Sequence, residues 1–358
     1  MPRTFQKLIA ATTACLAAFA CLATLGASFA AAEQIVVATT GGAYEKALRE
    51  AWFDPFTAKT GIEVVTVGAT NAEMRAKAAA MVKTGNVSWD LYLQGEIQAA
   101  SDQHLLYAEN LSAFCKEFST QADLDGEACN AAGVRLLSNS TLLAYRSDAF
   151  AGAAPTTWAD AWDVRKFPGG RSFPDFNDPW RVMAAALLAD GVSPEKLFPL
   201  DIDRALAKLE QIRPAVALWW KTGDQSMQGF RNGEYVVGQI WLTRAKAMKS
   251  EGLPIAWSHA ASFLVGDRIA LIKNAPHREN ALKLAEYWLN TPAAQAKVCE
   301  ALSCKPPSGE AVKLMSPQAR ADMPSMSDPQ SSPVIPDAKW INDNAALLLE
   351  RWNAWIQQ

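Results

Sequence analysis

Strand-like and helix-like segments alternate along this chain, and that alternation restricts the fold more than any other feature of its 358 residues. The β-branched residues 35–37 precede an amphipathic stretch at 43–60, and residues 62–67 precede another at 71–84. Alternation of this kind is typical of parallel α/β sheets that are covered by helices. We expect two such units, joined by more than one crossing of the chain, with a cleft between them.

The later part of the chain continues the pattern with shorter segments. We expect a short strand at 142–146, separate strands at 255–258 and 262–265, and a return crossing at 267–272. A helix at 342–356 carries apolar residues that must pack on the rest of the chain. The resulting division assigns residues 33–145 and 268–330 to lobe 1, residues 146–267 to lobe 2, and residues 331–358 to a C-terminal loop and helix that packs on the lobes.

Residues 1–32 have the three parts of a secretory signal peptide. Arg3 and Lys7 supply a charged start, residues 8–25 are rich in Ala and Leu, and residues 30–32 offer a small-residue cleavage site. A membrane anchor is the alternative, but this run is only marginally long and apolar for a bilayer span. We therefore expect an exported, soluble protein.

Composition argues against several classes of function. The net charge is −3 and no basic stripe suggests a nucleic-acid partner. The pattern G-x-x-x-x-G-K-S/T of a phosphate loop is absent, which makes a nucleotide site improbable. The three histidines are scattered and no C-x-x-C occurs, so we expect neither a metal ion nor another cofactor.

Four cysteines remain after the expected signal cleavage, and an even number in an exported chain suggests disulfides. They are Cys115, Cys129, Cys299 and Cys304. Three pairings are possible. Proximity in the sequence favours Cys115 with Cys129 and Cys299 with Cys304, which would make both bonds local links away from any site.

The stretch 218–245 contains the strongest candidate for a binding site. A mostly apolar strand at 235–241 ends at Trp241, and Arg244 follows shortly after it. Ligands of open α/β sheets bind at the carboxyl ends of strands. An aromatic face beside a fixed charge suits a small organic ion. For Trp241 alone, packing in the core is the more ordinary interpretation.

Five ordered segments carry a further signal, namely 187–192, 219–223, 232–241, 263–267 and 275–288. Together they resemble the extracellular solute-binding proteins of the spermidine/putrescine class, which serve ABC importers. The resemblance covers essentially all of the chain after residue 32, and no single segment decides it. It implies a periplasmic-binding-protein fold of two α/β lobes with a hinge and an interlobe ligand cleft. It also implies a periplasmic monomer that binds a small-molecule ligand and works with an inner-membrane ABC permease and its ATPase.

The resemblance also implies which residues line the cleft. Two loops would contribute from lobe 1, and the start of a helix would contribute from lobe 2. Trp241 is similar to the stacking tryptophan of the family and Asp267 to a ligand-facing aspartate. The other implied ligand-binding residues are Thr40, Gly41 and Gly42 in the first loop, Gln94 and Glu96 in the second, and Asp178 and Arg181 on the helix.

Two arginines depart from the family pattern, because putrescine-type binders carry acids at or near their positions. Arg244 could contact the ligand, or it could point away and pair with Glu234 or Asp224. Arg181 could equally be a solvated charge at a helix start. The pattern therefore leaves two ligands open, a polyamine such as putrescine or spermidine, and a zwitterionic ω-amino acid such as γ-aminobutyrate.

The second ligand follows from the chemistry of the candidate residues. Asp267 and Glu96 could hold an ammonium group, and Tyr44 and Trp241 could form walls along the carbon chain. Arg244 could then form a forked pair with a carboxylate.

An exported hydrolase is the alternative from another class of function. Asp175 with Asp178, or Glu96 with Asp267, could form a carboxylate pair for glycoside hydrolysis. Two acids in a cleft are common, however, and neither G-x-S-x-G nor H-E-x-x-H is present. A metal-binding relative of the same fold would require clustered tyrosine, histidine and acidic residues, and the tyrosines of this chain do not cluster. We therefore expect a binding protein and not an enzyme.

Overall fold

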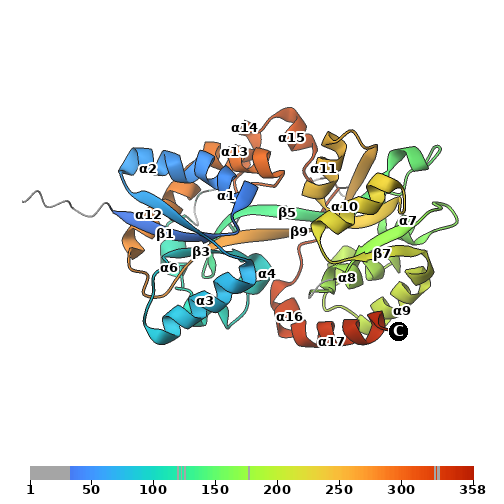
Figure 1. The fold of residues 1–358 in the computed structure, drawn as a ribbon, viewed down its shortest axis with the longest axis horizontal. Helices are drawn as coiled ribbons and strands as arrows, with labels where there is room; N and C mark the ends of the chain where they lie inside the picture. The colour runs from blue at the N-terminus through green and yellow to red at the C-terminus, as the bar shows by residue number, and fades with distance from the viewer. Residues whose placement is uncertain are drawn as a thin grey trace, which may run out of the picture. The chain divides into compact units, whose positions relative to one another are not determined.

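A nine-stranded mixed sheet organises the chain, and the strands follow the order β2-β1-β3-β9-β5-β8-β6-β7, with β4 paired to β5. The computed structural model describes residues 33–118, 121, 123–124, 126–175, 178–325, 328 and 331–358, so the signal peptide predicted at 1–32 lies outside the described residues. Residues 34–358 form one unit (Figure 1). The strands are β1 (Gln34–Thr39), β2 (Glu63–Gly68), β3 (Leu91–Gly95), β4 (Cys129–Asn130), β5 (Gly133–Arg146), β6 (Arg171–Pro174), β7 (Val216–Trp220), β8 (Val237–Trp241) and β9 (Ile255–Leu271).

The alternation of strands and helices predicts parallel sheets, and the observed sheet is mixed. Strand β1 runs parallel to β2 and β3, and β6 runs parallel to β7 and β8. In between, β9 is antiparallel to β3 and β5, and β5 is antiparallel to β8. The two parallel groups are thus connected through β5 and β9, which lie side by side across the centre of Figure 1.

The two connecting strands are also longer than the sequence predicts. The expected short strand at 142–146 is the end of a 14-residue strand, and the three segments expected from 255 to 272 are one 17-residue strand. Polar residues within both segments predict breaks in the strands there. The ladder instead absorbs the irregularities through register shifts near Leu137 and Leu143, and through Ala261 with φ of 49°.

Helices cover both sides of the sheet, with α2 and α3 on opposite sides of β1 and β3 in Figure 1. Several begin at side-chain caps, such as Thr70, which forms a capping box with Glu73 at the start of α3. A single turn of π-helix at Arg49–Phe53 joins α1 to α2. The helices are α1 (Gly42–Leu48), α2 (Asp54–Thr60), α3 (Asn71–Thr84), α4 (Glu96–Ala99), α5 (His104–Tyr107), α6 (Ser112–Lys116), α7 (Trp158–Trp162), α8 (Trp180–Ala189), α9 (Ile202–Ile212), α10 (Gly223–Asn232), α11 (Leu242–Ser250), α12 (Arg278–Leu289), α13 (Pro292–Leu302), α14 (Gly309–Leu314), α15 (Pro317–Ala321), α16 (Ala338–Asp343) and α17 (Ala345–Ile356).

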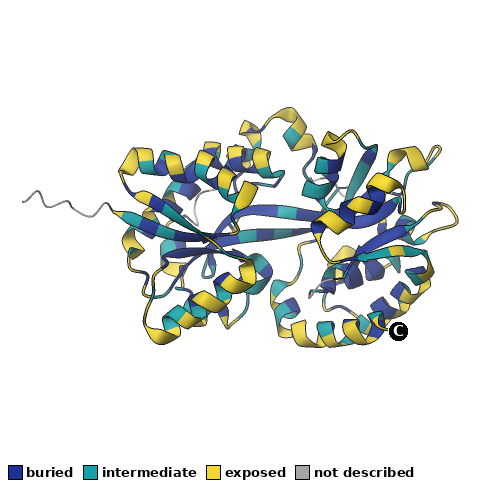
Figure 2. Ribbon diagram, in the orientation of Figure 1, coloured by how far each residue is buried: buried dark blue, intermediate teal, exposed yellow. Residues whose placement is uncertain are grey.

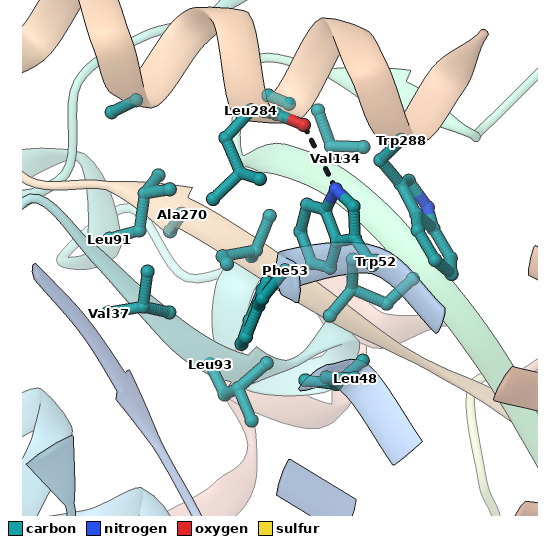
Figure 3. Packing of buried hydrophobic residues seen from close by; sticks show 14 of the residues in the cluster. Val37, Leu48, Trp52, Phe53, Leu91, Leu93, Val134, Ala270, Leu284 and Trp288 are labelled. Carbon is teal, nitrogen blue, oxygen red and sulfur yellow. Dashed lines mark hydrogen bonds between the residues drawn. The ribbon is translucent and has the colours of Figure 1, made fainter. Parts of the chain in front are cut away.

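The largest hydrophobic cluster lies around β1, β3 and the adjoining halves of β5 and β9. Trp52 is fully buried in it and donates a hydrogen bond from Nε1 to the carbonyl oxygen of Leu284, at 3.1 Å (Figure 3). The ring of Trp288 packs against Trp52 with centroids 4.8 Å apart. Buried residues follow the strands, whereas exposed residues gather on the outer faces of the helices (Figure 2).

A second cluster surrounds α8 and α9, and the C-terminal helices contribute to it. Trp352 and Trp355 of α17 both meet the ring of Trp219 edge-on, with centroids 5.5 Å apart in each pair. The expected C-terminal helix therefore packs on the part of the chain that was assigned to lobe 2. A smaller third cluster lies under α10 and α11.

The disulfides follow the pairing that sequence proximity favours. Cys115 is bonded to Cys129 and Cys299 to Cys304. The first bond ties α6 to β4, and the second closes the end of α13. Within the described ranges, no helix is long and apolar enough to cross a bilayer, and no three His, Cys, Asp or Glu side chains gather as a metal site would require.

Candidate functional site

A cavity of about 640 Å³ opens where strand ends and helix starts from both parts of the sheet meet. Helices α1, α3, α4 and α8 line it together with β3, β5, β8 and β9. Seven of the eleven residues predicted to bind ligand line this cavity. They are Thr40, Tyr44, Gln94, Asp178, Arg181, Trp241 and Asp267.

Asp267 is the one carboxylate in the cavity lining that forms no salt bridge with any described residue. Its side chain accepts a hydrogen bond from the Tyr44 hydroxyl at 3.4 Å. Burial, with the nearby charge of Glu96, raises the pKa of Asp267 to about 6, although Tyr44 and Arg181 act in the opposite direction. Burial also raises the pKa of Tyr44 well above its usual value, so its hydroxyl stays neutral and can donate. This pair can receive an ammonium group.

Trp241 ends β8 and is the residue that caps α11. Trp220 packs edge-on against it, with ring centroids 5.4 Å apart, and donates from Nε1 to the carbonyl oxygen of Gln239. Trp220 is fully buried, so it supports the cavity wall from behind. Neither Trp219 nor Trp220 lines the cavity, because Trp219 faces α17 and Trp220 faces the core.

Asp178 and Arg181 stand together at the start of α8. The Arg181 guanidinium forms an ion pair with the Asp178 carboxylate, and it also lies over the Trp180 ring, 4.5 Å from its centroid. The Arg181 side chain is only 13% exposed. An arginine that is already paired with an acid and stacked on an aromatic ring is held in place.

Arg244 lies outside the cavity lining. It sits in the first turn of α11, and its guanidinium pairs with Asp224 at 3.2 Å. Asp224 belongs to the first turn of α10, where a carboxylate also complements the helix N-terminus. One of the two pairings that were open from the sequence is therefore present, and the Arg244 side chain is 38% exposed.

Glu96 is also absent from the lining, because its carboxylate is occupied. One oxygen pairs with Arg135 and with Arg268, the latter at 2.7 Å, and the other accepts from the backbone N–H of Gly266 at 3.0 Å. Burial alone would raise the pKa of Glu96, but the two arginines hold it below its usual value. Glu96 therefore ties β3, β5 and β9 together directly behind Asp267.

The glycines of the first loop do not line the cavity either. Gly41 and Gly42 have φ values of 71° and 59°, a region that side chains rarely adopt. They turn the chain from β1 into α1, and the turn carries Thr40 and Tyr44 to the cavity. Their role in this structure is to shape the backbone.

Sequence reasoning missed several residues of the lining. The run 139–141, Asn-Ser-Thr, interrupts an otherwise apolar strand, and this was an available signal. Arg75 was not anticipated either, because it lies on α3 between apolar positions that indicate packing, such as Met74 and Ala78. The remaining polar residues that were not anticipated are Asn71, Gln98 and Thr243.

Comparison with known proteins identifies the family. The family described as bacterial extracellular solute-binding protein matches residues 51–325. The γ-aminobutyric acid-binding protein of Pseudomonas aeruginosa is 31% identical over 349 residues, covering 94% of this chain and 96% of that protein. The spermidine/putrescine-binding periplasmic protein of Escherichia coli is 27% identical over 309 residues, covering 82% and 83%.

A solved structure extends the likeness to the fold. The periplasmic binding protein AttC of Agrobacterium tumefaciens C58, in an open unliganded conformation, is 62% identical with a TM-score of 0.81. The match covers 90% of this chain and 99% of AttC. The fold is thus the periplasmic-binding-protein fold that the sequence predicts, and these relatives are binding proteins of transport systems. The chain belongs to the family of bacterial extracellular solute-binding proteins.

Proposed function

We propose that this protein captures a small zwitterion, with an amine at one end and a carboxylate at the other, for an ABC importer. The observation that carries the proposal is the balance of charge in the cavity. Two carboxylates, Asp178 and Asp267, and two guanidinium groups, Arg75 and Arg181, line the cavity. A diamine needs an excess of acid in the cleft, whereas a zwitterion needs both signs.

The remaining lining supports a ligand with an apolar middle. Asp267 is suited to the ammonium group, because among the described residues its side chain has one hydrogen-bond partner, the neutral hydroxyl of Tyr44. Tyr44 and Trp241 offer aromatic surface for a short carbon chain and for the cation at its end. An ω-amino acid such as γ-aminobutyrate combines these features. The identity to the γ-aminobutyric acid-binding protein, 31%, points in the same direction.

A polyamine such as putrescine or spermidine is the second candidate. Two carboxylates in one cavity with aromatic walls favour it, as does the likeness to the spermidine/putrescine-binding protein. It would require Asp178 to release Arg181, which a partly buried ion pair resists. For this reason we rank the polyamine second.

The transport setting follows from the family and completes the proposal. Residues 1–32 would direct export to the periplasm, and an inner-membrane permease with its ATPase would receive the ligand. Residues 33–145 with 268–330 would form lobe 1, and residues 146–267 lobe 2. Strands β5 and β9 would contain the hinge, because they connect the two parallel groups of strands. Closure of the lobes would enclose the cavity.

Binding measurements on the mature protein test the proposal. Calorimetric titration, supported by tryptophan fluorescence, should show binding of γ-aminobutyrate, β-alanine or 5-aminovalerate and weaker binding of putrescine and spermidine. Glycine betaine serves as a zwitterion without an N–H donor. Tight putrescine binding without response to any amino acid would replace the zwitterion by the polyamine. No binding across the panel would reject both ligand classes.

A further inference from the structure

We propose that Arg75, on α3, binds the carboxylate of the ligand and thereby selects zwitterions over diamines. This inference rests on the proposed function and adds a residue that neither the resemblance nor the charge pattern of the sequence had suggested. Arg75 lines the same cavity as Asp267, from a different element of the fold. Its side chain is neither fully buried nor fully exposed.

Arg75 differs from the other candidate arginines in its partners. Arg181 is already paired with Asp178, and Arg244 is paired with Asp224 outside the cavity. Arg75 forms no hydrogen bond and no ion pair with any residue that the structure describes. Its five N–H donors therefore remain for water or for a ligand, and a guanidinium can bind a carboxylate through two parallel hydrogen bonds.

No carboxylate among the described residues pairs with Arg75 at salt-bridge distance. The charge of Arg75 acts on the hydroxyls of Tyr92 and Tyr107, and burial raises the pKa of both tyrosines, so neither hydroxyl neutralises it. Asn71 and Ala72 in the first turn of α3 line the cavity too, although the Glu73 carboxylate caps this helix end and offsets its positive field. An anionic group is thus favoured at this end of the cavity.

The packing of helix α3 fixes the backbone position of Arg75. Met74 and Ala78 are fully buried, and Thr70 and Glu73 cap the first turn reciprocally. The position of the guanidinium therefore does not depend on a flexible loop. Once the Arg181–Asp178 pair is set aside, Arg75 and Asp267 are the two opposite charges that remain in the cavity. A ligand with an ammonium and a carboxylate complements both.

A paired-ligand titration tests the inference. The probes are the ω-amino acid that binds tightest in the panel and its carboxamide, which has the same length without the negative charge. The wild-type protein should prefer the acid over the amide on the order of 10- to 100-fold, as expected for a charge-assisted hydrogen bond. In Arg75→Gln that preference should disappear, because the affinity for the acid falls to that for the amide.

Two control variants keep the test specific. Lys77→Gln removes the same charge from an exposed position of the same helix, outside the cavity, and should keep the full preference. Arg75→Lys should retain part of it, since a point charge replaces the fork. An Arg75→Gln protein that still prefers the acid fully would overturn the role of Arg75 while leaving the proposed function intact. A wild-type protein that binds no amino acid would overturn both.

Discussion

The hydroxyl of Tyr44 lies 3.4 Å from Oδ2 of Asp267, although the two residues are 223 positions apart in the chain. Tyr44 belongs to the first helix and Asp267 to the last strand. Burial raises the pKa of both groups, so the tyrosine stays a donor and the carboxylate titrates at about 6. The carboxylate that we expect to bind the ligand amine therefore has a pKa close to physiological pH.

Amine binding should accordingly weaken in acid. The ligand ammonium requires the charged form of Asp267, whose pKa is about 6 in the ligand-free protein. Below that pH the dissociation constant should rise by up to about tenfold per unit, because a proton must leave before the amine binds. Calorimetry from pH 5 to pH 8 measures this dependence. Affinity that stays level down to pH 5 would show that Asp267 does not hold the amine.

The stability of the ligand-free protein should respond to the same group with a definite sign. A carboxyl whose pKa is raised on folding stabilises the fold below its unfolded value of about 4, and that contribution is lost as the pH rises through about 6. Asp267→Asn should therefore increase the urea midpoint at pH 8 more than at pH 4. An unchanged difference between the two pH values would contradict the raised pKa.

Replacement of Tyr44 by Phe should move the pH dependence upward. The hydrogen bond from Tyr44 lowers the pKa of Asp267, so its loss leaves burial and the charge of Glu96 less opposed. We expect the midpoint of the pH–affinity curve to rise, with a loss of affinity of about 1 kcal/mol at pH 8. Titration of both proteins over the same pH range gives the comparison. A midpoint that falls would exclude this hydrogen bond.

Much of the fold could be predicted, because strand and helix periodicities are local. The strand β2 and the helices α3 and α17 lie close to the places expected for them at 62–67, 71–84 and 342–356. The pairing directions could not be read in the same way. Whether β9 runs parallel or antiparallel to β3 depends on contacts between Leu91 and Leu271, which are 180 positions apart and leave no periodic signal in either strand.

The residues of the site were predicted only in part, because sequence position shows where a residue lies in the fold but not which partner its side chain binds. Thr40, Tyr44 and Trp241 follow strand ends or helix starts, which topology brings to one place. Glu96 and Arg244 have the right residue type, but their charges are taken up by Arg135, Arg268 and Asp224. Which partner an acid or an arginine chooses is decided by side-chain packing in three dimensions, and sequence spacing does not reveal it.

Truncation of a large side chain in the main hydrophobic cluster should lower the free energy of unfolding strongly. Trp52 is fully buried, is hydrogen-bonded to the Leu284 carbonyl and packs on Trp288. Trp52→Ala should lower the free energy of unfolding by about 3–5 kcal/mol. Leu106→Ala, at a position that is 69% exposed, should change it by less than about 0.5 kcal/mol. Urea unfolding followed by far-UV circular dichroism avoids the lost tryptophan signal. Equal effects of the two variants would contradict the packing around Trp52.

Substitution of Glu96 should show whether this residue stabilises the fold or binds the ligand. Its carboxylate pairs with Arg135 and with Arg268, which is 1% exposed. Glu96→Gln removes the carboxylate that both guanidinium groups share, although Arg268 also lies 3.4 Å from a carboxylate oxygen of Glu127, so we expect a loss of about 3 kcal/mol in the free energy of unfolding. Glu310→Gln, which breaks a surface pair with Lys313, should cost less than about 1 kcal/mol.

The same variant should also lower the pKa of Asp267, because the charge of Glu96 raises it. At temperatures where Glu96→Gln remains folded, amine binding should therefore persist to a lower pH than in the wild-type protein. Urea unfolding and titrations at pH 5 and pH 8 test the two effects separately. A Glu96→Gln protein of normal stability that has lost all affinity would mean that Glu96 contacts the ligand directly, as the sequence pattern had indicated. Our interpretation of Glu96 as an anion held behind the site predicts the opposite combination, a less stable protein that still binds.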